Sequence, residues 1–353
     1  MTRNNALPLQ VNHLTADAFS QQPASWKNSV LGALCFTAEV TESHIADASV
    51  PCKRIAMRRL DAGKSACEVW HGSAPVTQGR HGPIYYSHDG NVLFGVIACP
   101  EEDFKFVAGK TPLQQATEWA YRQVFALLET LNYPCLFRFW NYLPDINAHS
   151  HGLERYRQFN LGRQDAFVAH DHALAGDVPA ACALGAAEGP LTIAFLAGRV
   201  QPTRIENPRQ VSAYHYPSQY GPSSPMFSRA SLVRWQQEEV LLLSGTASVV
   251  GSETLHPGDV LAQTHETLSN IRAILTEANR LASRPGFNLA SLKCRVYIRN
   301  PADFATIRAA LTRDIGNPPD AVYLQAEVCR HDLMLEIEAT AVQALAEPTG
   351  SLD

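Results

Sequence analysis

The feature of this sequence that most restricts its fold is a repeated order of secondary-structure elements. In the second half, periodicity predicts a strand at 238–251, a helix at 261–279, a strand at 291–300, a helix at 301–311, and strands at 321–328 and 333–341. Leu268, Ile271 and Leu275 have the spacing of one buried helical stripe. We therefore predict an α+β unit in which helices pack on one face of a mixed β-sheet.

The first half repeats this order in a weaker form. Its predicted elements are a strand at 90–100, a helix at 111–132, a strand at 135–143, and a helix beginning at 152–163. Arg138 in this copy stands where Arg295 stands in the other. Internal repeats indicate related structural units. We predict a degenerate N-terminal domain at 1–175, an Ala/Gly-rich linker region at 176–210, and a better preserved C-terminal domain at 211–345, while residues 1–84 match no motif.

Composition and charge exclude several classes of protein. The 353 residues carry a net charge of -5 with no clustered Lys and Arg, so no nucleic-acid or anionic-membrane partner is predicted. The first residues lack the apolar segment of a secretory signal, and no apolar run approaches the ~20 residues that cross a bilayer. We expect a cytoplasmic protein.

The eight cysteines are scattered along the chain without a C-x-x-C spacing. In a cytoplasmic protein this pattern predicts reduced, mostly buried thiols, and it does not predict a zinc site. No metal or cofactor site is predicted from the sequence.

Carboxylates at alternate positions distinguish the last predicted strand, "LMLEIEATA" (333–341). Met334, Glu336 and Glu338 share one face of such a strand. One interpretation is a solvated face, and the other is a functional site that holds Glu336 in a pocket.

The C-terminal half resembles the small trimeric YjgF/RidA-like proteins over residues 216–341. The resemblance lies in "YGPSSPMFSRASLV", "LLLSGTAS", "AQTHETLSNIRAIL", "CRVYIRNPADFATI" and "LEIEATA". It implies two YjgF-like units, the N-terminal one degenerate, a homotrimer, and a pocket that partly shields Glu336. Imine-deaminating members of that family carry an Arg where Ala321 stands here. Without that guanidinium, the chain lacks the cation that binds the substrate carboxylate in those members, so deamination is not expected.

Longer motifs resemble the chorismatase family over about 85–341. They are "FRFWNYLPDIN", "GLERYRQFNLGR", "SAYHYPSQYGPSSPMFSRA" and "SGTASVVGSETLHPGD". The resemblance implies an enzyme that removes pyruvate from chorismate without a metal or organic cofactor, in which 211–345 is the catalytic domain. Ala247 and Cys329 occupy the two positions associated with product choice. This combination is expected of the pigment-pathway subtype, which forms 3-hydroxybenzoate with some 4-hydroxybenzoate.

The expected chemistry assigns roles to particular side chains. Protonating the enolpyruvyl ether needs an acid that keeps its proton near pH 7, so we predict Glu336 as proton donor, with Glu338 raising its pKa or serving the structure. Cys329 is predicted to guide the later step, with a buried packing thiol as the alternative.

Two substrate carboxylates and a ring need cations, hydroxyl donors and flat apolar walls. The candidates for these roles are Arg229, Tyr214, Tyr216, Tyr220, Ala247, Arg163 and Arg155.

Two rival interpretations stay open. The enzyme could hydrolyse chorismate to a dihydroxycyclohexadiene carboxylate plus pyruvate, although Cys329 favours the hydroxybenzoate route. Alternatively, the chain could be a non-catalytic YjgF-like protein that binds a small molecule.

Overall fold

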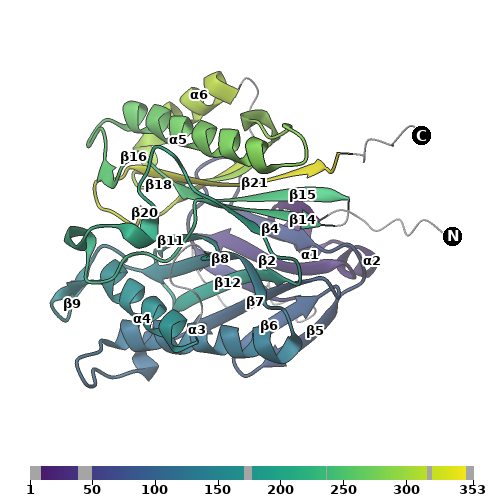
Figure 1. The fold of residues 1–353 in the computed structure, drawn as a ribbon, viewed down its shortest axis with the longest axis horizontal. Coiled ribbons are helices and arrows are strands. Elements are labelled where there is room, and N and C mark those ends of the chain that lie inside the picture. The colour runs from purple at the N-terminus through teal and green to yellow at the C-terminus, as the bar shows by residue number, and fades with distance from the viewer. Residues whose placement is uncertain (1–8, 39–49, 171–176, 236, 316–319, 347–353) are drawn as a thin grey trace, which may run out of the picture.

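Three larger β-sheets, two two-stranded hairpins and six α-helices make up the part of the chain described by the computed structural model, which covers residues 9–38, 50–170, 177–235, 237–315 and 320–346. The four longer helices lie on the outside of two sheets, and the third sheet lies between those two layers (Figure 1). The α+β class and the mixed sheets with helices on one face, predicted from the sequence, are confirmed.

The C-terminal unit is a six-stranded sheet covered by helices α5 (Val260–Leu281) and α6 (Phe304–Ile315). Asp259 caps the start of α5, because its side chain accepts a hydrogen bond from the Ala262 amide at 2.9 Å. The strand order is β13 (Thr203–Ile205), β14 (Ala230–Trp235), β15 (Glu238–Thr246), β21 (Leu335–Ala344), β18 (Lys293–Ile298) and β19 (Asp320–Gln325).

The second sheet has seven strands and is covered by α3 (Pro112–Leu131) and α4 (Arg155–Ala169). Its order is β20 (Glu327–Val328), β11 (Ala180–Ala186), β8 (Cys135–Pro144), β12 (Leu191–Gly198), β7 (Val92–Cys99), β6 (Ile84–His88) and β5 (Thr77–His81). Strand β20 comes from the C-terminal half of the chain, so this sheet joins the two halves.

The prediction of a linker at 176–210 is wrong for most of that segment. Strands β11 and β12 both lie in it and flank β8 in the seven-stranded sheet. Ala, Gly and Leu dominate both strands, and 14 of their 15 residues are buried. A strand that is buried on both faces shows no alternation of polar and apolar residues, which is why its sequence resembled a connecting segment.

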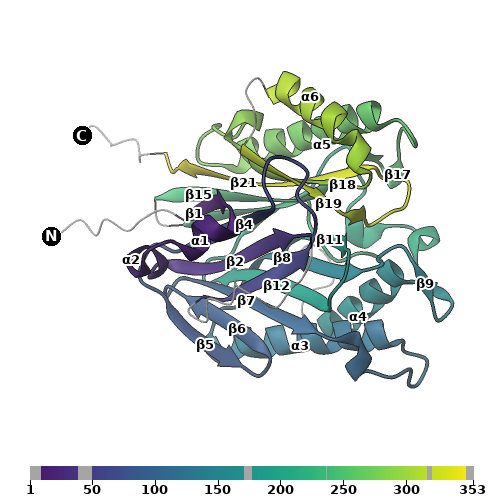
Figure 2. The same cartoon turned by 180° about the vertical axis from the view of Figure 1, so that it is seen from behind.

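The N-terminal residues, which matched no motif, form the third sheet. Its order is β1 (Gln10–Leu14), β4 (Ser65–His71), β2 (Val30–Thr37) and β3 (Cys52–Ala56), with short helices α1 (Ala16–Ser20) and α2 (Ala24–Lys27) beside it. Seen from behind, this sheet lies between the other two (Figure 2). The tilted rings of Trp70 and Trp140, 5.4 Å apart, join it to the seven-stranded sheet.

A disulfide between Cys35 and Cys67 corrects the prediction that all cysteines are reduced. The two residues are direct partners in the antiparallel pair β2 and β4. Direct partners across an antiparallel pair bring their β-carbons close together, and the sequence does not reveal which strands pair. Cys52 on β3 lies nearby, with its Sγ 3.8 Å from that of Cys35.

Small hairpins and 3₁₀ turns complete the described fold. The hairpins pair β9 (His149–Ser150) with β10 (Leu153–Glu154) and β16 (Val249–Val250) with β17 (Glu253–Thr254). The 3₁₀ turns are η1 (Glu101–Asp103), η2 (Ala213–His215), η3 (Ser218–Tyr220), η4 (Leu289–Ser291) and η5 (Pro301–Asp303). None of the helices in the described residues has the length and hydropathy needed to span a membrane.

Candidate active site

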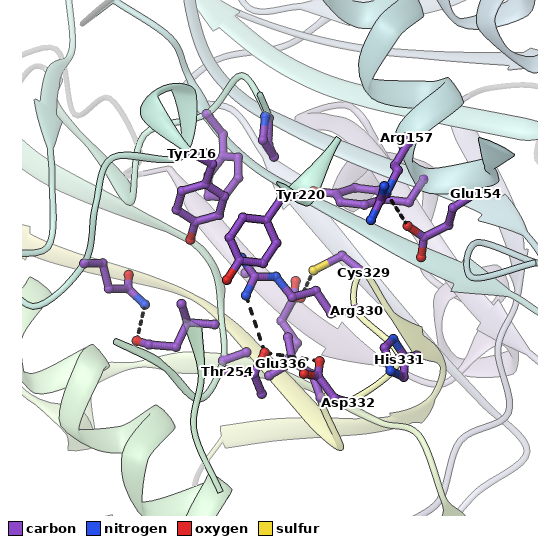
Figure 3. Close-up of a pocket in the computed structure, with 18 of the residues that line it drawn as sticks. Glu154, Arg157, Tyr216, Tyr220, Thr254, Cys329, Arg330, His331, Asp332 and Glu336 are labelled. Atoms are coloured by element: carbon purple, nitrogen blue, oxygen red, sulfur yellow. Dashed lines mark hydrogen bonds and ion pairs between the residues drawn. The ribbon is translucent and has the colours of Figure 1, made fainter. Parts of the chain in front are cut away.

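A cavity of about 250 Å³ is lined by the N-terminal end of α4, the segment from Tyr216 through η3, and the chain between β20 and the start of β21 (Figure 3). Both halves of the chain line it. The lining residues used below are Tyr156, Arg157, Tyr216, Tyr220, Arg229, Gly245, Ala247, Cys329, Arg330, His331 and Glu336.

Glu336 is buried on β21, with 4% of its surface exposed, and its carboxyl group faces the cavity. Its neighbour on β15 is Gly245, where a β-carbon would overlap Oε1 of Glu336. The pairing of β15 with β21 shifts register between Leu243 and Thr246, which marks a β-bulge. The bulge and the missing side chain together make the room that Glu336 occupies.

Ser244 fixes the bulge in position. Its hydroxyl donates to the Ser228 carbonyl at 2.6 Å and accepts from the Ala181 amide at 2.9 Å. Strand β11 therefore anchors the point on β15 that faces Glu336.

Burial, reinforced by the nearby carboxylate of Glu338, raises the pKa of Glu336 to about 8. Arg138, the Cys329 thiol and Arg229 act in the opposite direction and do not overcome the burial. Glu336 therefore holds its proton at neutral pH. The interpretation of this strand face as solvated is wrong, because both Glu336 and Glu338 are buried against the neighbouring sheet.

Glu338 is held by cations and a hydroxyl. The Tyr297 hydroxyl donates to its Oε1 at 2.6 Å, and Nε of Arg295 lies 2.7 Å from the same oxygen. Arg138, on β8 of the other large sheet, pairs with Oε2. Arg138 and Arg295 are the residues that correspond in the two copies of the sequence repeat, so each copy supplies one arginine to the same carboxylate.

Cys329 follows β20 and lies beside Glu336. Its Sγ is 3.9 Å from Oε2 of Glu336 and donates toward it. Burial, with the nearby Glu336 carboxyl group, raises the pKa of the thiol to about 12, so Cys329 is protonated at neutral pH. Ala247 packs in the same small apolar cluster as Cys329. The two positions predicted to affect product choice therefore lie together at one wall of the cavity.

Arg229 also lines the cavity and lies just before β14. Its Nη2 donates to the Val211 carbonyl at 2.8 Å and to the Tyr216 hydroxyl at 2.9 Å. Its Nε is buried and has no hydrogen-bond partner among the described residues. A buried guanidinium with an unused donor is suited to bind an anion.

Aromatic rings and a second arginine form the mouth of the cavity. The Arg330 guanidinium lies 4.1 Å from the centre of the Tyr220 ring and 5.2 Å from that of Tyr216. Its Nη1 donates to the Ser252 carbonyl at 2.8 Å. Figure 3 shows Arg330 between Tyr220 and Thr254, with Cys329 next to it.

Three predicted substrate-binding residues lie outside the cavity lining. Arg155 pairs with Glu101, and Tyr214 packs against the core of the N-terminal half and the ring of His215. Arg163 is buried behind the wall and donates to Oδ1 of Asn160 at 3.0 Å. Successive residues of a helix point in different directions, so only part of "ERYRQFNLGR" reaches the cavity.

The sequence interpretation missed several residues of the cavity lining. Tyr156 and Arg157 come from α4, between the two arginines that were chosen, while Arg330 and His331 follow Cys329. Helical periodicity alone did not reveal which side of α4 faces the second half of the chain. Arg330 could have been predicted from the sequence, because it directly follows Cys329. Among the described residues, no three His, Cys, Asp or Glu side chains are grouped as metal ligands would be.

Comparison with known proteins decides the family. Residues 68–197 match the model described as "Chorismatase FkbO/Hyg5-like, N-terminal", and residues 226–343 match the model "Endoribonuclease L-PSP". A 3-hydroxybenzoate synthase from Streptomyces hygroscopicus is 37% identical over 289 residues, which cover 78% of this chain and 81% of that protein. The chain belongs to the chorismatase family.

Other relatives agree with this assignment. A chorismatase from Streptomyces rapamycinicus is 36% identical over 282 residues, which cover 78% of this chain and 82% of the relative. The crystal structure of a chorismatase at 1.08 Å resolution has a TM-score of 0.83 and 30% identity to this chain, and the match covers 95% of this chain and 98% of that one. The chorismatase likeness therefore extends over the N-terminal sheet as well as the two larger units.

Proposed function

We propose that this chorismatase converts chorismate to 3-hydroxybenzoate, with some 4-hydroxybenzoate, and pyruvate. The observation that carries the proposal is Glu336, a carboxylic acid with a pKa of about 8 that faces a cavity also lined by Arg157, Arg229 and Arg330. The family of the chain and its 3-hydroxybenzoate synthase relative support the same substrate and product.

Glu336 is the proton donor in this proposal. Chorismate carries an enolpyruvyl ether at C3, and its methylene carbon accepts the proton from Glu336 to give an oxocarbenium-like centre. The side chain is then a good leaving group, because cleavage of the C3–O bond releases pyruvate as the neutral ketone. A carboxyl group with an ordinary pKa would be almost fully ionised at pH 7 and could not start this reaction.

The arginines hold the two substrate carboxylates. Arg229 offers a buried guanidinium with an unused donor on one wall, while Arg330 and Arg157 offer cations at the mouth. Tyr216 and Tyr220 supply flat walls for the six-membered ring. Charge-assisted hydrogen bonds of this kind fix a dianion in one orientation and so bring its enol ether to Glu336.

After protonation, the 4-hydroxyl of the substrate attacks C3 and expels pyruvate, which leaves an arene oxide. The hydroxyl proton goes to the carboxylate of Glu336 and restores the acid. The oxide then opens, its oxygen takes a proton, and the carbon that keeps this oxygen loses its proton, which gives a hydroxybenzoate with no net change in protons. Cys329 and Ala247 form an apolar wall beside Glu336 and keep water from competing with the 4-hydroxyl.

Product analysis tests the proposal. The purified protein is incubated with chorismate, and aromatic products and pyruvate are separated and measured beside the Glu336→Gln variant. Formation of 3-hydroxybenzoate and pyruvate that depends on Glu336 supports the proposal. Release of only the dihydroxycyclohexadiene carboxylate with pyruvate would assign the hydrolytic reaction. Binding of chorismate without pyruvate release would leave the non-catalytic binding protein as the function.

The homotrimer stays a prediction from the family resemblance, and the cytoplasmic location stays a prediction from the sequence. Sedimentation velocity would measure the assembly, and the same product assay on each separated species would relate it to activity.

A further inference from the structure

The N-terminal sheet places a buried carboxylate in contact with the charges around the active site. Glu68, on β4, is 5% exposed, and its Oε1 lies 3.1 Å from Nη2 of Arg295. The indole of Trp70 donates to the same oxygen at 2.9 Å. His13, on β1, lies 3.2 Å from Oε2 of Glu68. The mechanism proposed above gives none of these groups a role.

Arg295 joins this carboxylate to the active site because each of its three nitrogens has a different partner. Nη2 pairs with Glu68, Nε lies 2.7 Å from Oε1 of Glu338, and Nη1 donates to the Tyr142 hydroxyl at 2.7 Å. One positive charge is therefore divided between two buried carboxylates. Glu338 lies two residues from Glu336 on the same face of β21, which puts the two carboxylates roughly 7 Å apart.

We propose that Glu68 is a positioning residue that keeps Glu336 in its acid form, acting through Arg295 and Glu338. This inference rests on the proposed role of Glu336 as proton donor. Because Glu68 takes part of the charge of Arg295, Glu338 keeps a larger uncompensated negative charge. That charge opposes ionisation of Glu336. The negative charge of Glu68 itself acts in the same direction.

The other charged and titratable groups around the cluster come from several elements. Glu336 faces Glu338, Arg138, Arg229, the Tyr156 hydroxyl and the thiols of Cys329 and Cys182. Glu338 faces Arg138, Arg295, the hydroxyls of Tyr297 and Tyr142, and the thiols of Cys182 and Cys294.

At the far end of the cluster, His13 faces Glu68 and lies 3.0 Å from Asp320, which also pairs with Lys293. Of these groups, Glu68 is the one that competes with Glu338 for Arg295. Removal of its charge should therefore lower the pH at which Glu336 ionises.

The test compares Glu68→Gln with the wild type in two readouts. Glutamine keeps the shape and can still accept from Trp70, so the change removes mainly charge. The first readout is the pH dependence of kcat/KM with chorismate. The second is infrared titration of the protonated Glu336 carbonyl band without substrate, with the band assigned from its loss in Glu336→Gln.

The expected result is that the midpoint of Glu336 ionisation falls by up to about one pH unit in both readouts, as a charge ~12 Å away predicts at an effective dielectric constant of ~20. Glu68→Asp, which keeps the charge, should have a midpoint near that of the wild type. Asp61→Asn is the matched control, because it removes a carboxylate from the N-terminal half that pairs with Arg59 outside the cluster. Its midpoint should not move.

Reduced activity of Glu68→Gln with an unchanged midpoint would overturn the proposal, because a merely structural contact lowers activity without moving the titration. If Glu68→Gln does not fold, His13→Gln gives the second test. It removes the imidazole beside Glu68, and with it the positive charge that His13 carries when protonated, so the midpoint should move upward; a downward or absent shift would contradict the proposal. The infrared readout distinguishes failure of this inference from failure of the proposed function, because it reports the ionisation of Glu336 even if chorismate is not the substrate.

Discussion

Raising the pH should inactivate this enzyme by removing the proton from Glu336. With a pKa of about 8, roughly 90% of the acid is protonated at pH 7 and roughly 10% at pH 9. A carboxyl group with a pKa of 4.5 would be about 0.3% protonated at pH 7. Burial of Glu336 therefore increases the active form by about 300-fold at neutral pH. We expect kcat/KM to be level below pH 7 and to fall about tenfold per unit above pH 8.

The Glu336→Gln variant tests whether Glu336 is the group whose ionisation causes the loss of activity at high pH. An amide fills the same space but cannot supply the proton, so kcat should fall about 100- to 10,000-fold, the usual contribution of a positioned acid. Any remaining activity should lose its dependence on a group that titrates near pH 8. The assay is initial-rate pyruvate release in buffers of constant ionic strength from pH 5 to 10.

Glu327→Gln serves as the control, because it changes an exposed carboxylate on the nearby β20, outside the cavity lining. Its profile should match that of the wild type. The reasoning is refuted if the alkaline limb of the profile persists in Glu336→Gln, or if the wild-type midpoint lies near pH 5.

Further predictions concern the same wall of the cavity, its cations and its stability. Gly245→Ala should reduce kcat about 100-fold, since its methyl group displaces the Glu336 carboxyl group, and a crystal structure of the variant would show the displacement. Cys329→Ala should shift the products toward the dihydroxycyclohexadiene carboxylate, because a smaller side chain admits water beside Glu336; an unchanged product ratio on chromatography would contradict that role. Arg229→Met should raise KM about 100-fold through the loss of a charge-assisted contact, whereas Arg122→Met, at an exposed site on α3, should leave kinetics unchanged. Glu336→Gln should be more stable than the wild type above pH 8: the folded-state pKa lies above the unfolded one, so the stabilising contribution is complete below pH 4.5 and is lost as pH rises through 8. Thermal melts at pH 6 and 9 measure this difference, and an equal Tm shift at both pH values would contradict it.

Local patterns in the sequence were enough for the α+β class, the order of the larger helices and strands, and the strand that carries Glu336. Period-2 and period-3.6 patterns report which face of an element is apolar, and they arise from residues close together in the chain. Long motifs pointed to the chorismatase family and to Glu336, Cys329, Ala247 and Arg229, which the structure brings to one cavity.

Features that depend on pairing between distant segments could be found only from the tertiary structure. The N-terminal sheet, the Cys35–Cys67 disulfide and the central strands β11 and β12 follow from which strands pair, and a strand buried on both faces gives no periodic signal. The pKa of Glu336 was expected to rise, but its value depends on Arg138, 198 residues earlier in the chain, and on burial between two sheets. Electrostatic interactions depend on distance in space, and that distance is fixed only when the sheets have packed together.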